Sequence, residues 1–150
     1  MIIEYTPEGG EKEVLDAGRL RASEIQLVER TADMTWGEVK GGLMGGNVTA
    51  RRTVAWALKK RTQPGLRLAE FDPFEDELVV RLDAAEVRAY AAEIHAEYAD
   101  KPEQMQAAFD ELREAAFDAE ACELAIKEAQ TPKGPDPAPA ATASGSPAVS

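Results

Sequence analysis

Residues 41–61, GGLMGGNVTARRTVAWALKKR, come nearest in this sequence to a ligand-binding motif. Four glycines fall within six positions and lead into a helix-like run with one tryptophan and five basic side chains. A phosphate-binding loop of this outer spacing needs a lysine and a hydroxyl residue directly after its last glycine. Asn47 and Val48 stand there instead, and no strand-like run precedes the glycines. We therefore interpret the glycines as turn residues that end one helix, and we expect no nucleotide site.

The basic helix expected over residues 48–61 has two interpretations. In one, Trp56 stacks on a base or fills a partner's pocket, while Arg52, Lys59 and Lys60 contact phosphate or acidic side chains. In the other, Trp56 is buried and the basic stems pack around it. We favour burial, because tryptophan is highly buried on average and the chain as a whole is acidic.

The remaining residues that could act in catalysis or bind a metal are scattered along the sequence. His95 is the only histidine and Cys122 the only cysteine, so neither a histidine cluster, an internal disulfide nor a cysteine-based zinc site can form. The carboxylates near Asp72 lack the spacing of a calcium loop. No nucleophile, base and oxyanion donor come together in the sequence. We expect no catalytic residue, no cofactor and no metal, and hence a protein that is not an enzyme.

Charge is unevenly distributed along the chain. The net charge is −11, which argues against general affinity for nucleic acid or anionic membranes. Residues 1–70 hold 11 basic and 10 acidic side chains, a net of +1, whereas residues 71–130 hold 5 and 17, a net of −12. We interpret these acids as solvated helix faces; the alternative is that they steer or repel a partner. With no signal-peptide pattern and no long apolar run, we expect a soluble, cytosolic-type chain.

The periodicity predicts a mainly α (α+β) fold in one small helix-rich domain, residues 1–130. A turn at Pro7-Glu8-Gly9-Gly10 predicts a β-hairpin over residues 1–18. Short helices are expected over residues 19–82, and two apolar stripes separated by Lys101-Pro102 predict an acidic antiparallel helical hairpin over residues 83–130. Residues 131–150 contain five prolines and almost no large apolar side chain, so we expect a disordered tail.

Start signals place the short helices. Ser23 with Gln26 and Thr35 with Glu38 have the spacing of capping boxes, and Asn47 can cap the next helix. Asp72-Pro73-Phe74-Glu75 has the pattern of another helix start, after which Phe74, Leu78 and Leu82 keep helical spacing. Residues 77–82 equally suit a strand added to the hairpin, and periodicity alone does not decide between the two.

A thin, alanine-rich core leaves some large apolar side chains without an obvious internal partner. Phe117 and Leu124 fall off the apolar stripe of the last helix, so they either widen the buried face or form an exposed edge for a partner. Trp36 and Trp56 are the other large side chains that could anchor a partner. The candidate partner-binding residues are therefore Trp36, Trp56, Phe117 and Leu124.

Residues 19–82 resemble the tail assembly chaperones of long-tailed bacteriophages of the siphovirus type, especially those that infect actinobacteria. The resemblance is carried by SEIQLVERTADMTWGEVKGGL and ARRTVAWALKKRTQPGLRLAEFDPFEDEL. Within them the family shows a similar Thr-Trp helix start, a glycine break, a W-x-x-x-[KR] helix and an acidic segment near an aromatic-Asp pair, which here are Trp56 with Lys60 and Phe71-Asp72. A glycine commonly follows the threonine of the family's first helix, whereas Ala32 follows Thr31 here.

The resemblance implies a non-catalytic protein of the infected cell's cytoplasm that is absent from the mature virion. Such proteins hold the tape measure protein soluble until tail tube subunits polymerise around it, and self-association of the chaperone is compatible with that role. A programmed ribosomal frameshift often extends them, and Thr131-Pro132-Lys133 can be encoded by a slippery heptamer. The alternatives are a virion structural or head–tail connector protein, and a small nucleic-acid-binding regulator that uses the basic helix.

Overall fold

The computed structural model describes residues 1–132, which form six α-helices and one small sheet. In chain order the elements are β1 (Ile2–Tyr5), β2 (Glu13–Asp16), α1 (Ala22–Ala32), α2 (Trp36–Gly45), α3 (Val48–Lys59), the 3₁₀ turns η1 (Leu68–Glu70) and η2 (Glu75–Glu77), β3 (Leu78–Arg81), α4 (Ala84–Glu97), α5 (Pro102–Ala115) and α6 (Ala119–Gln130). The predicted mainly α (α+β) fold is confirmed. The expected disordered tail, residues 131–150, lies outside the described residues apart from Thr131 and Pro132.

The sheet confirms the predicted hairpin and adds a third strand to it. The strand order is β2-β1-β3, and both pairings are antiparallel, with Ile3 opposite Leu15 on one side and opposite Val80 on the other. Residues 78–81 are therefore a strand, which settles the choice that periodicity left open. Cross-strand packing decides it, because Leu78 is buried and Val80 packs against the same core as Ile3.

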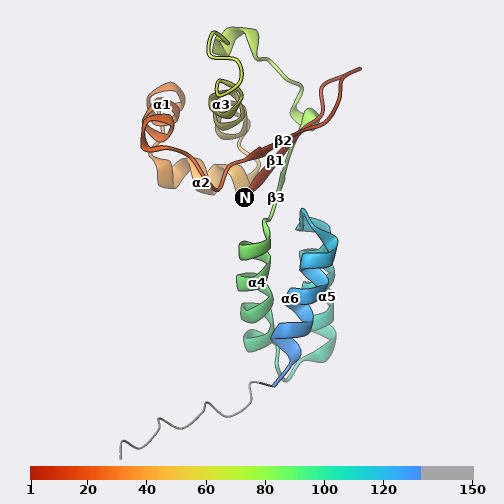
Figure 1. The fold of residues 1–150 in the computed structure, drawn as a ribbon. Helices are drawn as coiled ribbons and strands as arrows, with labels where there is room; N and C mark the ends of the chain where they lie inside the picture. Colours follow the sequence, from red (N-terminus) through yellow and green to blue (C-terminus); the bar gives the residue numbers. More distant parts are fainter. Residues whose placement is uncertain (133–150) are drawn as a thin grey trace, which may run out of the picture.

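Helices α1, α2 and α3 pack beside the sheet and form the first hydrophobic core (Figure 1). Helix α3 is its centre: Val54, Ala55 and Leu58 are buried, and α3 contacts all three strands as well as α1 and α2. Residues 53–58 of α3, more than one full turn, are all buried, so this part of the helix is covered on every side.

Two predicted helix starts are confirmed and two are wrong. Thr35 with Glu38 forms the expected capping box, and Asn47 Oδ1 accepts a hydrogen bond from Ala50 N at 2.9 Å. At α1, however, Arg21 is the N-cap residue, and the Glu24 carboxylate accepts from the Arg21 N–H at 2.7 Å, so Ser23 lies inside the helix.

Asp72-Pro73 does not begin an α-helix either. The chain is extended at Phe74, passes through the single turn η2 and enters β3. A run of three acids at Glu75, Asp76 and Glu77 offers no apolar face that could pack, so tertiary pairing with β1 prevails over the local start signal.

Of the glycines in residues 41–46, only Gly46 ends a helix. Helix α2 runs through Gly41, Gly42 and Gly45, and it ends at Gly46, whose φ of 80° is the left-handed conformation of a helix C-cap. The expectation that the whole cluster stops the helix is wrong for the first three glycines. Gly42 faces α3, where a Cβ would meet the Ala50 Cβ at 3.0 Å, so this glycine allows the two helices to approach closely.

Residues 83–130 form three helices rather than the predicted hairpin of two. The long second helix is interrupted at residues 116–118, where Ala116 is extended and Asp118 caps α6 by accepting from Ala121 N. Each helix then runs antiparallel to the one before it (Figure 1). Helix α6 packs mainly against α4. Buried side chains of these helices, together with Leu82 directly after β3, form a second core that is separate from the first: Leu82, Val87, Ala91, Phe109, Leu112, Cys122, Ala125 and Ile126.

The segment between α5 and α6 connects the helical unit α4–α6 to the unit formed by the sheet and α1–α3. Leu82 N donates to Ala115 O and Phe117 N donates to Leu82 O, both at 2.9 Å, so residues 115–117 form a parallel bridge to the end of β3. Arg81 also donates to Glu114 O, and the α-amino group of Met1 contacts Asp83 and Glu86 at the start of α4.

Candidate partner-binding surface

Trp56 is part of the first core and is not presented to a partner. Its side chain is 7% exposed, and its Nε1 donates to Leu66 O at 2.9 Å. The Lys60 ammonium lies 5.2 Å from the centre of the Trp56 ring. Burial, which the sequence favoured, is confirmed for Trp56, and the buried ring leaves little surface for contact with a partner.

The basic side chains of α3 are also occupied within the chain. Arg52 donates to Phe71 O and Leu68 O, both at 2.8 Å, and Lys59 pairs with Glu13 at 2.7 Å. The Arg61 guanidinium donates two hydrogen bonds to the Glu24 carboxylate, each at 2.7 Å. These cations hold loops and neighbouring helices in place instead of forming a free basic stripe, and this weakens the nucleic-acid interpretation.

Trp36 is half-buried at the start of α2 and packs against the first core. The backbone N–H of Trp36 donates to the Glu29 carboxylate of α1 at 2.8 Å, which fixes the α1–α2 corner. This residue therefore contributes mainly to packing, with part of its ring left on the surface.

Phe117 and Leu124 are both exposed, which answers the question that the sequence left open about them. Phe117 is 41% exposed in the segment between α5 and α6, and Leu124 is 53% exposed on α6. Leu124 points away from the second core because Ala125 and Ile126 occupy the buried face of α6. The off-stripe pair forms exposed apolar surface on the acidic unit rather than a wider core.

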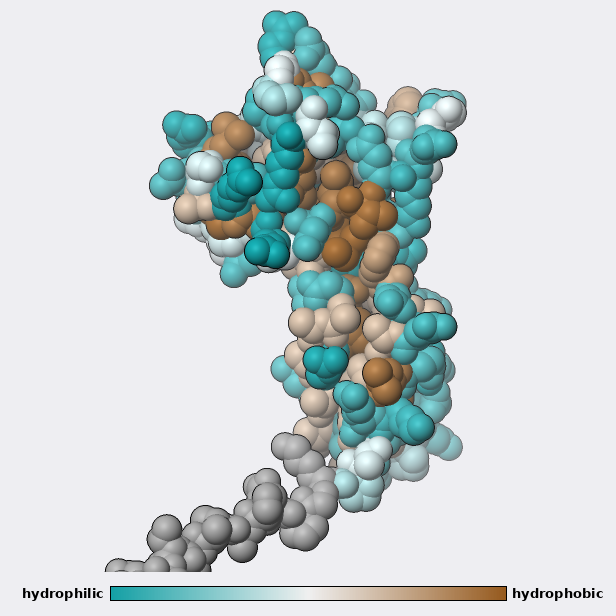
Figure 2. All heavy atoms as spheres, viewed as in Figure 1, coloured by the Kyte–Doolittle hydropathy of each residue, from teal (hydrophilic) through white to brown (hydrophobic). Residues whose placement is uncertain are grey.

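A second apolar surface covers the side of the sheet that faces away from α3. Because side chains alternate along a strand, and Ile3 and Val80 face the core, Ile2, Val14 and Val79 face the other way. Figure 2 shows hydrophobic side chains gathered over the sheet, and a smaller hydrophobic area over α6. Glu4 lies on the same face between Val14 and Val79, and its carboxylate makes ion pairs with Lys12 and Arg81 there.

A cavity of about 580 Å³ runs beside β3, on the edge that β1 does not cover. It is lined by Arg51, Phe74, Glu75, Asp76, Leu78, Val79 and Val80. A smaller cavity of about 120 Å³ adjoins the same region between Val48 and Phe74. Phe74 is 66% exposed here, although the sequence placed it on a helix stripe with Leu78 and Leu82. No local signal in the sequence marks this exposed position, because Asp72-Pro73-Phe74-Glu75 fits the pattern of a helix start.

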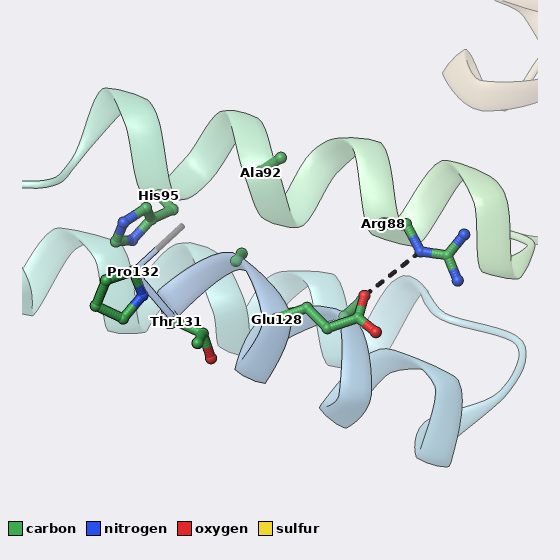
Figure 3. Close-up of a pocket in the computed structure, with 8 residues that line it drawn as sticks. Arg88, Ala92, His95, Glu128, Thr131 and Pro132 are labelled. Carbon is green, nitrogen blue, oxygen red and sulfur yellow. Dashed lines mark ion pairs between the residues drawn. The ribbon is translucent and has the colours of Figure 1, made fainter. Parts of the chain in front are cut away.

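A groove also lies between α4 and α6, with a volume of about 400 Å³ (Figure 3). The Arg88–Glu128 ion pair, 3.6 Å long, spans one end, and His95, Thr131 and Pro132 lie at the other. Among the described residues, the buried Nδ1 of His95 has no hydrogen-bond partner. Alanines form much of the remaining wall, so this groove offers few groups that could orient a substrate.

Neither a metal centre nor a reactive thiol is evident in residues 1–132. No group of three or more histidine, cysteine or acidic side chains is placed to hold a metal ion there. Cys122 is buried in the second core, and that burial raises the pKa of its thiol, which disfavours the reactive thiolate. Within the same residues, no helix has the length and apolar character to cross a membrane.

Comparisons with protein-family models, with curated proteins and with solved structures found no match to this chain.

Proposed function

We propose that this protein is a tail assembly chaperone of a long-tailed bacteriophage, which binds the tape measure protein and keeps it soluble during assembly of the tail tube. The resemblance of residues 19–82 to that family supports the proposal, together with the capping box at Thr35 and the Trp56 helix that follows the glycines. The protein acts in the host cytoplasm and is absent from the finished particle, and tail tube subunits displace it.

The observation that carries the proposal is the exposure of Phe117 and Leu124 on a strongly acidic helical unit. Reversible binding of an apolar helix requires large apolar side chains on the surface, where each truly anchoring residue contributes about 2 kcal/mol or more. The surrounding carboxylates keep the chaperone and its complex in solution by mutual repulsion. Trp36 gives a smaller apolar contribution, and Trp56 gives none because it is buried.

The test is co-expression with the cognate tape measure protein, with its soluble fraction as the readout. Phe117→Ala and Leu124→Ala should each release insoluble tape measure protein while the melting temperature of the chaperone stays nearly unchanged, since both side chains are exposed. Lys127→Ala, an exposed change on the same helix, is the matched control and should retain solubility. If the tape measure protein is equally soluble without this chain, the chaperone proposal fails.

Purified particles distinguish the chaperone from a virion component. A structural or connector protein would remain in purified virions at a fixed ratio to the tail tube subunit, whereas the chaperone should be missing from them. Its presence at such a ratio would overturn the proposed role.

A further inference from the structure

The free edge of β3 carries backbone N–H and C=O groups that have no hydrogen-bond partner in residues 1–132. Thr6 N donates to Glu77 O at 3.0 Å, so in this antiparallel register the backbone groups of residues 77, 79 and 81 point to β1. Those of Leu78, Val80 and Leu82 point to the opposite edge. Leu82 uses both of its groups to bind residues 115–117, and the Leu78 N–H is taken by Glu75 O. In residues 1–132 no partner is found for the N–H and C=O of Val80 or for the C=O of Leu78.

The same edge carries side chains suited to hold an added strand. The cavity of about 580 Å³ lies along Leu78, Val79 and Val80, and Phe74 forms an exposed apolar wall of it. Unlike this edge, the open edge of β2 lies among exposed charged residues such as Lys12 and Asp16. Residues 115–117 show that the β3 edge already accepts an extended segment at Leu82.

We infer that an extended segment of a partner protein adds to the edge of β3 at Leu78 and Val80, with an apolar side chain against Phe74 and a lysine or arginine beside Glu75 and Asp76. Main-chain hydrogen bonds supply the affinity in this mode of recognition, and the pockets for alternate side chains supply the specificity. A basic residue fits the charge of the groove, because Glu75 and Asp76 line it with Arg51 as the one cation among its lining residues. Asp72, next to the groove, pairs with Arg52 at 4.0 Å. This surface is distinct from Phe117 and Leu124 and does not depend on the proposed chaperone role.

A second copy of this chain fits the edge less well than a basic partner. Antiparallel pairing of two β3 strands around Val80 would bring the acidic residues 75–77 of one copy towards residues 115–117 of the other, which already occupy the edge at Leu82. Glu114 lies next to that segment, so like charges would meet across the pair.

The test adds a synthetic hexapeptide, in which lysine alternates with valine, to the full chain and follows the chemical shifts of the backbone amides. Addition of the peptide at millimolar concentration should shift the amides of Val80, Phe74 and Arg51, and methylation of alternate peptide nitrogens should abolish the effect. No shift at this edge with the unmodified peptide overturns the inference. Shifts of the same amides that depend on protein concentration without peptide would identify a second copy as the occupant and would also overturn it.

Two variants and one control variant separate loss of binding from loss of folding. Val80→Pro removes the free N–H and should weaken peptide binding at least tenfold, whereas Val14→Pro, which removes an outward N–H on the open edge of β2, should leave it unchanged. Phe74→Ala changes only an exposed side chain, so the variant should fold normally and still lose at least threefold in affinity. Equal affinity in Phe74→Ala and in the unchanged protein would contradict the proposed groove.

Discussion

At the scale of single residues, the ion pair between Glu24 and Arg61 connects α1 to the turn that follows α3. Arg61 reaches from the end of α3 to α1, donates two hydrogen bonds to the Glu24 carboxylate and a third to Arg19 O at 2.8 Å. The hydrogen bonds from Arg61 hold the pKa of Glu24 below its usual range, even though partial burial acts in the opposite direction. The same pair raises the pKa of Arg61.

A pH-dependent stability follows from this pair. The pKa of Glu24 is lower in the folded chain than in the unfolded chain. Ionised Glu24 therefore stabilises the folded chain at a pH above its unfolded-state pKa, and this contribution is lost as the pH falls through its folded-state pKa. Glu24→Gln should therefore lower the free energy of unfolding by about 1 kcal/mol at pH 7, a modest value because Arg61 is partly exposed. The difference between the variant and the unchanged protein should shrink in strong acid.

Urea unfolding at neutral and acidic pH measures that difference. Glu97→Gln, an exposed carboxyl with no ion pair among the described residues, serves as the control and should have no effect at either pH. An equal loss for Glu24→Gln at both pH values would show that the charge of Glu24 is not what stabilises the α1–α3 contact.

At the scale of elements, the glycines of α2 have different roles that the sequence does not distinguish. Gly41 is exposed, and a Cβ there would meet nothing within 4 Å. At Gly42 the added Cβ would lie 3.0 Å from the Ala50 Cβ and 3.1 Å from the Asn47 Cβ, both at the start of α3. Gly41 therefore lowers the stability of the helix without a packing role, whereas Gly42 is needed for the close packing of α2 against α3.

The matched pair Gly41→Ala and Gly42→Ala tests this distinction. Gly41→Ala should raise the free energy of unfolding by up to about 1 kcal/mol, because alanine is the better helix former. Gly42→Ala gains the same propensity but crowds α3, and overpacking costs about 1–3 kcal/mol, so it should be the less stable of the two. Thermal unfolding of both variants decides the matter, and equal melting temperatures would contradict the close approach of α2 and α3.

At the scale of the whole molecule, two hydrophobic cores share one chain. The first contains the sheet and α1–α3, and the second contains α4–α6. The link between them consists largely of the bridge between Leu82 and Ala116 and polar contacts around Asp83. Because no buried cluster of residues 1–132 spans both units, destabilising one core should have little effect on the other.

Phe109→Ala should show this independence. Phe109 is 1% exposed in the second core, and removal of such a side chain costs about 3–5 kcal/mol. Hydrogen exchange should then lose protection across α4–α6 while α3 and β1 keep theirs. Val54→Ala, in the first core, is the reciprocal control and should leave α4 protected. Uniform loss of protection in Phe109→Ala would mean that the two units unfold as one.

The sequence by itself determined the elements whose signals are local. The hairpin at residues 1–18 follows from its turn, α2 from the Thr35–Glu38 capping box, and α3 from the Asn47 cap, because these depend on neighbours within a few residues. The burial of Trp56 was also foreseen, since tryptophan rarely stays exposed. The exposure of Phe117 and Leu124 was one of two alternatives that periodicity allowed.

Only the tertiary structure decided the elements that depend on distant partners. Residues 78–81 become a strand because β1 offers an open edge, and the last predicted helix divides at residues 116–118 because that segment pairs with Leu82. Gly42 stays inside α2 because α3 packs against it. Local pattern does not encode these outcomes, because contacts between residues far apart in the chain outweigh propensities of less than about 1 kcal/mol per residue.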